Sequence, residues 1–247
     1  DTQDARLTLA IMSALLDEQR GLLEQLVNPR RVQRAGRTFW CGQWFGQEVV
    51  LVLTKIGKVA AATTTTTLIE AFGVNRVVFT GVAGGVGAEV KVGDVVVADA
   101  FVQHDMDSRP LFPRFEIPLY GCARFACDGS LTALLLEATR EGLASVGEHF
   151  HHEQLLAAPE VHSGLVASGD RFVASADDVA QVLSGLQTSG FSPLAVEMEG
   201  AAVAQVCHDY SVPFAAVRTI SDRADAKAHV DFAAFVKQVA SPYALAI

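Results

Sequence analysis

Two glutamates, Glu197 and Glu199, follow a short apolar segment, and the small residues Gly200, Ala201 and Ala202 come directly after them. Side chains two residues apart on a strand point to the same side, so the two carboxylates face one place and repel each other when they lose water. A bound ligand with several hydroxyl groups would offset this repulsion by donating hydrogen bonds. The pair therefore indicates chemistry on a polyhydroxylated substrate.

A third acid, Asp222, follows a predicted buried strand at residues 213–220. Ligands of open α/β proteins bind at such strand ends, and there Asp222 would be a proton donor. The alternative is a helix cap or a turn residue, since aspartate is favoured at both. Arg218, on the same strand, either serves the site or simply pairs with a carboxylate such as Glu197.

Glu18 lies near the junction of a predicted strand at residues 7–13 with a predicted helix at 14–27. Its simpler interpretation is a solvated acid in a first helical turn, where the helix dipole favours negative charge. His104, Asp105 and Asp107 are likewise more often polar loop residues than catalysts. From these segments alone, Asp222 is the stronger catalytic candidate.

The glycine-rich segment TGVAGGVG at residues 80–87 suggests close approach of a ligand to the backbone. It lacks the Lys-Ser/Thr ending of a P-loop and does not reproduce GxGxxG, so a phosphate cradle is the weaker interpretation. A flat heterocycle or a ribose suits these small residues better.

One segment invites a metal interpretation, because it combines His149, His151, His152 and Glu153. The spacing is not that of HExxH, and the segment follows the exposed end of a predicted helix. We therefore expect neither a metal nor a cofactor.

Apolar runs and helical periodicities alternate along most of the chain. They predict strands at 7–13, 34–42, 43–54, 76–80, 95–102, 161–168, 194–197 and 214–220, the second and third being joined around Cys41 and Gly42. Helices are predicted at 14–27, 58–72, 130–147, 175–188, 199–210 and 231–240. Such alternation indicates one α/β domain over residues 1–247 with a mostly parallel sheet.

Two segments are unusual in composition. The run from Thr63 to Thr67 has poor helix propensity, but apolar residues flank it, so we expect a packed helix whose hydroxyls return to carbonyls one turn earlier. A Thr-rich loop that holds anions is the alternative. Residues 107–127, rich in proline and aromatic residues, predict a long functional loop or a partner surface.

Composition restricts the class of protein. The formal net charge is -9 and the isoelectric point is about 5.2, so we expect no binding to nucleic acid. Charged residues interrupt the apolar runs, so that none is long enough to cross a bilayer. We therefore expect a soluble protein that does not bind membranes. Four scattered cysteines suggest reduced thiols and the cytoplasm. Because the sequence begins at Asp1 rather than Met, a processed or exported form is the alternative.

Eight segments, in order and spacing, resemble the bacterial 5'-methylthioadenosine/S-adenosylhomocysteine nucleosidases, within the purine nucleoside phosphorylase and hydrolase family. They are SALLDE at 13–18, GKVAA at 57–61, TGVAGG at 80–85, KVGDVV at 91–96, HDMD at 104–107, SGDRF at 168–172, VEMEGAA at 196–202 and RTISD at 218–222. The resemblance spans nearly the whole chain. It implies a single-domain, three-layer fold with a mixed, mostly parallel sheet flanked by helices.

The resemblance also implies a reaction, namely hydrolysis of the N-ribosyl bond to adenine without a cofactor. Asp222 would protonate the departing purine and Glu18 would activate water, which suits a transition state with positive charge on the ribose and negative charge on the purine. As in inverting glycosidases, the two acids should lie on opposite sides of the sugar, with room for the water. The implied substrate-binding residues are Ala83, Gly84, Phe172, Val173, Glu197, Met198, Glu199, Arg218 and Ser221.

Among these, Glu199 would bind the ribose hydroxyls, Met198 would lie beside the sugar, and Phe172 would stack on the base. The backbone around Val173 would contact the adenine edge. The family's members form homodimers that donate apolar residues to the neighbour's alkylthio pocket. Phe112 and Phe115 are the candidates here, with ordinary core packing as the equal alternative.

Two departures from the family pattern matter. Val82 replaces the serine of TGSAGG, which removes a hydroxyl that would help to order the water beside Glu197 and Arg218. The turn that usually carries consecutive acids has Asp17 and Glu18 after two leucines, so only Glu18 is transferred from the family.

Three rival functions follow. A phosphorylase on the same fold would need several cationic side chains at the nucleophile site, and the segment entering residue 80 offers only Arg76. A nucleosidase for aminofutalosine-type substrates differs in the pocket for the 5' substituent, where the resemblance is weakest. A nucleoside-binding protein without turnover is conceivable because of Val82.

Overall fold

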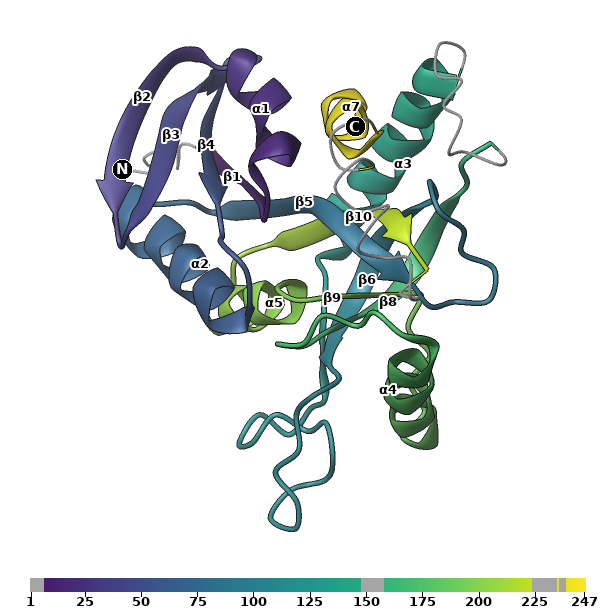
Figure 1. Ribbon diagram of the computed structural model, residues 1–247. Coiled ribbons are helices and arrows are strands. Elements are labelled where there is room, and N and C mark those ends of the chain that lie inside the picture. The colour runs from purple at the N-terminus through teal and green to yellow at the C-terminus, as the bar shows by residue number, and fades with distance from the viewer. Residues whose placement is uncertain (1–6, 148–157, 224–234, 236–238) are drawn as a thin grey trace.

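A mixed sheet of ten strands forms the centre of the computed structural model, which describes residues 7–147, 158–223, 235 and 239–247 (Figure 1). The strands are β1 (Thr8–Ser13), β2 (Val27–Arg34), β3 (Arg37–Trp44), β4 (Gln47–Leu53), β5 (Arg76–Gly85), β6 (Val95–Gln103), β7 (Arg124–Ala126), β8 (Val161–Ser168), β9 (Ala195–Glu197) and β10 (Phe214–Asp222). The helices are α1 (Leu16–Glu24), α2 (Lys58–Phe72), α3 (Gly129–Gly147), α4 (Ala176–Thr188), α5 (Gly200–Asp209) and α7 (Ser241–Ala246). The predicted α/β class is confirmed.

The sheet closes partly on itself. Its order is β10-β6-β8-β9-β5-β1-β4-β3-β2, with β7 paired to β6, and β5 also pairs with β10. Strands β5, β10, β6, β8 and β9 therefore form a ring. Parallel pairings join β1 to β4 and β5, β10 to β5, and β8 to β6 and β9, whereas the other pairings among the described strands are antiparallel. The sheet is thus mixed, as predicted, and its parallel pairings join more residues than its antiparallel ones.

Helices cover both sides of the sheet. Helix α7 packs between α1 and α3, and α2 packs on α5, with the two groups lying above and below β5 in Figure 1. Burial from both sides explains the continuous apolar runs of the central strands. Strand β10 is buried at every position, so its polar residues Arg218, Ser221 and Asp222 must find partners inside the protein.

Two strands lie between residues 34 and 54, as predicted, but their junction is not at Cys41 and Gly42, and the strand before them, β2, was not predicted. Three strands, β2, β3 and β4, form a meander that turns at Ala35-Gly36 and Phe45-Gly46, and Gly42 lies within β3. Both residues of each turn have positive φ, as tight hairpin turns require. Alanine and phenylalanine are not typical of such turns, so the sequence did not predict them. Strand β2 is an exposed edge strand whose arginines discourage pairing with another sheet, so it lacks the apolar alternation that would predict it.

Helix α2 has the predicted bounds, including the threonine run. The hydroxyls of Thr63, Thr64, Thr65 and Thr67 each donate to the carbonyl four residues earlier, at 2.8 Å. These bonds satisfy the hydroxyls inside the helix, which lets Thr64 and Thr65 be buried. The prediction of a packed helix is confirmed.

Other boundaries differ by a few residues. Strand β5 extends to Gly85 rather than ending at residue 80, so the glycine-rich segment is part of the sheet, and α1 is shorter than predicted. Helix α7 has no counterpart among the predicted helices. The helix predicted at 231–240 lies mostly outside the described residues, and the histidine cluster at 149–153 lies wholly outside them.

The described residues lack two features. Within the ranges given above, no helix is long and apolar enough to cross a membrane. The same ranges contain no group of three or more His, Cys, Asp or Glu side chains placed to hold a metal ion.

Candidate active site

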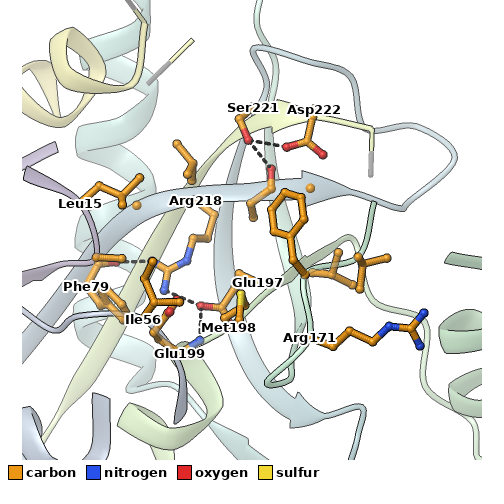
Figure 2. A pocket seen from close by; sticks show the side chains of 18 residues that line it. Leu15, Ile56, Phe79, Arg171, Glu197, Met198, Glu199, Arg218, Ser221 and Asp222 are labelled. Atoms are coloured by element: carbon orange, nitrogen blue, oxygen red, sulfur yellow. Dashed lines mark hydrogen bonds and ion pairs between the residues drawn. The ribbon is translucent and has the colours of Figure 1, made fainter. Parts of the chain in front are cut away.

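A pocket opens beside the carboxyl ends of β9 and β10, along the second half of β5 (Figure 2). Its wall is formed by residues 14–15, 56, 79, 81–84, 171–173, 196–199, 218 and 221–222. The cavity encloses about 180 Å³. Since one water needs only about 10 to 15 Å³, the pocket has room for an organic ligand.

Every residue predicted for the site, except Glu18, lies on this wall. They are Ala83, Gly84, Phe172, Val173, Glu197, Met198, Glu199, Arg218, Ser221 and Asp222. For Glu18 the structure describes the backbone, in the first turn of α1, and not the side chain. Ala14 and Leu15, which precede that turn, are on the wall. The chain therefore brings distant segments to one cavity, and the start of α1 borders it.

Arg218 and Glu197 form a buried ion pair in the pocket wall. The distance from Nη2 of Arg218 to Oε2 of Glu197 is 3.0 Å, and both side chains are almost fully buried. The guanidinium carbon of Arg218 also lies 4.0 Å from the centre of the Phe79 ring, and Nη1 donates to the Phe79 carbonyl oxygen at 2.9 Å. Removing one partner of such a pair typically costs about 3 to 5 kcal/mol, because a buried charge is left uncompensated.

Glu197 is satisfied by the protein itself. Besides Arg218, its carboxylate accepts the hydroxyl of Ser168 and the backbone N–H groups of Glu199 and Gly200, the last at 2.8 Å. These N–H groups belong to the start of α5, where a carboxylate is favoured by the unpaired donors and the helix dipole. Donors from the protein therefore compensate the charge of Glu197, where the sequence suggested that a substrate could do so.

Glu199 connects the pocket with α2. It is buried, and its Oε1 accepts the backbone N–H of Gly57, immediately before α2, at 2.8 Å. The next residue, Gly200, allows no side chain, because a Cβ there would lie 2.1 Å from the ring of Phe101. Close packing of α5 against β6 thus fixes the carboxylate of Glu199 at the pocket.

Asp222 stands where β10 becomes irregular. The pairing of β10 with β5 shifts between Ile220 and Asp222, and Asp222 pairs with Gly84. Such irregularities re-aim a side chain at the end of a strand. The Ser221 hydroxyl donates to Oδ2 of Asp222 at 2.7 Å, and both residues are buried.

The remaining wall is apolar and includes backbone. Phe172 is 41% exposed, and with Ile56 and Met198 it offers an apolar surface. Gly81 and Gly84 present backbone alone, so a flat ring or a sugar can approach closely. The cavity therefore combines an apolar wall with three acids, namely Glu197, Glu199 and Asp222.

Several contributors to the site were not predicted from the sequence. Ser168 was quoted in a motif but given no role, although it lies opposite Glu197 in the pairing of β8 with β9. Ser168 is not on the pocket wall, whereas further wall residues had no predicted role, namely Ala14, Leu15, Ile56, Phe79, Arg171 and Val196. A position at the end of a strand was the one available signal, and it applied to Ser168.

The polar residues after β6 are confirmed as loop residues. Asp107 accepts two hydrogen bonds from the Arg109 guanidinium, which holds the pKa of its carboxyl at about 2. Asp105 pairs with Lys58 at 2.6 Å; burial raises the pKa of Asp105, but the bonds from Lys58 and from the Asp170 N–H outweigh it and lower the pKa overall. Neither residue is on the pocket wall.

His104 is buried at the end of β6, and within the described part of the chain its Nε2 has no hydrogen-bond partner. Burial lowers the pKa of its imidazole below the ordinary 6.5, although Asp105 and Glu197 act in the opposite direction. The unfolded chain then binds the proton more readily. The contribution of His104 to stability is complete above about pH 6.5 and declines as the pH falls towards the folded-state pKa.

We therefore expect His104→Phe to flatten the acid side of the stability profile. Urea unfolding of both proteins between about pH 5 and 8 measures it, and each unit of pKa lowering corresponds to about 1.4 kcal/mol. His208→Gln, on the exposed side of α5, is the control. Parallel profiles for the original protein and His104→Phe would contradict the expectation.

The family is established by comparison with known proteins. The family model described as "Phosphorylase superfamily" matches residues 8–246, so the chain belongs to the phosphorylase superfamily. The nucleoside phosphorylase-like fold, with a mixed sheet flanked by helices, agrees with this membership.

Within the superfamily, the chain is similar to nucleosidases. It is 36% identical over 233 residues to an aminodeoxyfutalosine nucleosidase of Helicobacter pylori, covering 94% of this chain and 92% of that protein. It is 34% identical to a 5'-methylthioadenosine/S-adenosylhomocysteine nucleosidase of Aeromonas salmonicida, covering 93% and 92%. The crystal structure of the latter type of nucleosidase from Neisseria meningitidis, in complex with methylthio-immucillin-A, has a TM-score of 0.82 at 37% identity, covering 97% and 96%.

Proposed function

We propose that this protein hydrolyses the N-glycosidic bond of adenine nucleosides, releasing adenine and the free sugar. The substrates are 5'-methylthioadenosine, S-adenosylhomocysteine and 5'-deoxyadenosine. The observation that carries the proposal is the convergence of Glu199 and Asp222 on one apolar pocket that the start of α1 borders. The names of the similar proteins support it.

In this proposal each acid has one task. Asp222, buried at the end of β10, gives its proton to a purine nitrogen as the glycosidic bond breaks. Glu18 takes a proton from water, whose oxygen then bonds to the anomeric carbon from the opposite face. Glu199 accepts hydrogen bonds from the ribose hydroxyls and stabilises positive charge on the ring. Phe172 stacks on the base, and Met198 contacts the sugar.

The cationic side chains of the pocket wall are already paired, which favours water over phosphate as the nucleophile. Among the described wall residues, the cationic side chains are Arg171 and Arg218. Arg218 is held by Glu197 and two backbone carbonyls, and Arg171 pairs with Asp178. Arg76, at the opposite end of β5 from the glycines, is not on the wall. A phosphorylase would need cations available to phosphate.

A panel of nucleosides tests reaction and substrate together. It contains 5'-methylthioadenosine, S-adenosylhomocysteine, 5'-deoxyadenosine, adenosine, inosine and aminofutalosine, with base release followed in phosphate-free buffer. Turnover of the three named substrates supports the proposal. Aminofutalosine is included because similar proteins are named aminodeoxyfutalosine nucleosidases. Tight binding of adenine nucleosides without any turnover would instead support the nucleoside-binding alternative.

We also propose that the protein acts as a homodimer in the cytoplasm. The segment between β6 and β7 extends away from the sheet (Figure 1) and exposes Leu111 and Leu119 at 83% and 91%. Phe115 is buried under Arg114, which supports the alternative of core packing for this residue. Four free cysteines support a reducing compartment.

Replacing Leu119 by Asp tests the dimer, because a charge in an apolar interface is left without a partner. We expect light scattering to report twice the mass of the chain for the original protein and the mass of one chain for Leu119→Asp. Glu116→Gln, on the same segment, is the control. A single-chain mass for the original protein would contradict the dimer.

A further inference from the structure

We propose that Lys58, Asp105 and Asp170 are positioning residues that hold the base-contacting segment 171–173 against the start of α2. This inference rests on the proposed function, since it names the residues that prepare the same pocket for the base. None of the three lies on the pocket wall. They act through the residues that do.

The three residues form a closed ring of hydrogen bonds. Lys58 Nζ donates to Asp105 Oδ1 at 2.6 Å, and the backbone N–H of Asp170 donates to Asp105 Oδ2 at 2.8 Å. The backbone N–H of Lys58 donates to Asp170 Oδ1, also at 2.8 Å. Lys58 Nζ further donates to Gln103 Oε1 at 2.9 Å, which anchors the ring to the end of β6. Three loops that are distant in sequence are thus connected.

The start of α2 is the point where this ring meets the pocket. Gly57 donates its N–H to Glu199, and the next N–H, from Lys58, goes to Asp170. Two N–H groups that have no acceptor within the helix therefore hold both the ribose-contacting acid and the turn that carries Phe172. Gly57 has a φ of 97°, and a Cβ there would lie 3.2 Å from Asp170 Oδ1, so glycine is required at this junction.

The ring is placed to affect geometry more than overall stability. The side chains of Lys58, Asp105 and Asp170 are 16%, 31% and 50% exposed. Partly exposed ion pairs contribute little to folding, so variants of the ring should fold. Phe172, two residues beyond Asp170, is itself 41% exposed. The Arg171–Asp178 pair and the buried Val173 also hold the segment, and the ring adds its connection to the start of α2.

Lys58→Met removes the ammonium group and keeps an unbranched chain of similar length. We expect KM for all adenine nucleosides and the inhibition constant of adenine to rise together, by about tenfold, while kcat changes by less than about twofold. This pattern is expected when a variant weakens the contact with the base by the same free energy in the ground state and in the transition state. Lys91→Met is the matched control, because Lys91 forms a partly exposed pair with Glu160 that is distant in sequence from the ring.

Two further readouts separate positioning from a loss of folding. Trypsin should cut after Arg171 faster in Lys58→Met than in the original protein, because the turn is no longer held. Asp170→Ala should behave like Lys58→Met, whereas Asp170→Asn keeps an oxygen for the Lys58 N–H and should restore most of the affinity. The denaturant midpoint should be the same in all these variants.

The inference is overturned by an unchanged adenine inhibition constant and unchanged trypsin sensitivity in Lys58→Met. A loss of kcat in proportion to the unfolded fraction would overturn it as well. If the original protein released no base, the proposed function would fail. Adenine binding by calorimetry and trypsin cleavage would still decide the inference.

Discussion

Replacement of Asp222 by Asn is expected to lower kcat for adenine release by about 10² to 10⁴, which is the usual contribution of general acid catalysis. Asparagine keeps the size of the side chain and an oxygen that accepts the Ser221 hydroxyl. It has no acidic proton, so the purine must leave as an anion. Binding of the nucleoside should change little, and KM should therefore remain close to its original value.

The leaving group offers a direct control for this role. A 4-nitrophenyl riboside has a leaving group that needs no proton, so Asp222→Asn should cleave it nearly as fast as the original protein does. Asp177→Asn, an exposed residue in the first turn of α4, controls for the change in charge. If Asp222→Asn cleaved 5'-methylthioadenosine with the same kcat as the original protein, Asp222 would be excluded as the general acid.

Replacement of Glu18 by Gln is expected to abolish turnover and to leave the affinity for the nucleoside intact. Water attack then lacks its base, and the loss should again reach about 10² to 10⁴ or more. The structure supports this through the backbone, since Glu18 lies in the first turn of α1, directly after the wall residues Ala14 and Leu15.

Single-turnover adenine release and calorimetric binding, on the same samples, measure rate and affinity separately. Glu24→Gln, at the other end of α1, is the matched control. Loss of binding in parallel with rate would assign Glu18 to substrate binding. Normal turnover in Glu18→Gln would exclude it as the base.

The sequence predicted the helices and strands whose apolar residues follow a regular pattern. Strand β8 and helix α2 have the predicted bounds, because an uninterrupted apolar run and a helical period are properties of the local sequence. The turns at Ala35-Gly36 and Phe45-Gly46 were missed because their first residues are ordinary. The closure of β5 onto β10 was missed because strand pairing depends on segments more than a hundred residues apart.

The sequence predicted which residues form the candidate site, but not the hydrogen bonds that they make. Asp222 and Glu197 stand at strand ends, which a sequence reveals, and the resemblance supplied Phe172 and Met198. The partners of Glu197 were not predictable, because Ser168 reaches it through the register of β8 against β9. Glu199 reaches Gly57 only when α5 and α2 pack together.

Product analysis tests the central claim most directly. The protein is incubated with 5'-methylthioadenosine in the presence of phosphate, and the sugar product is identified by mass spectrometry. The proposed chemistry predicts adenine and free 5-methylthioribose, at the same rate whether or not phosphate is present. Formation of 5-methylthioribose 1-phosphate, or strict dependence of adenine release on phosphate, would contradict it.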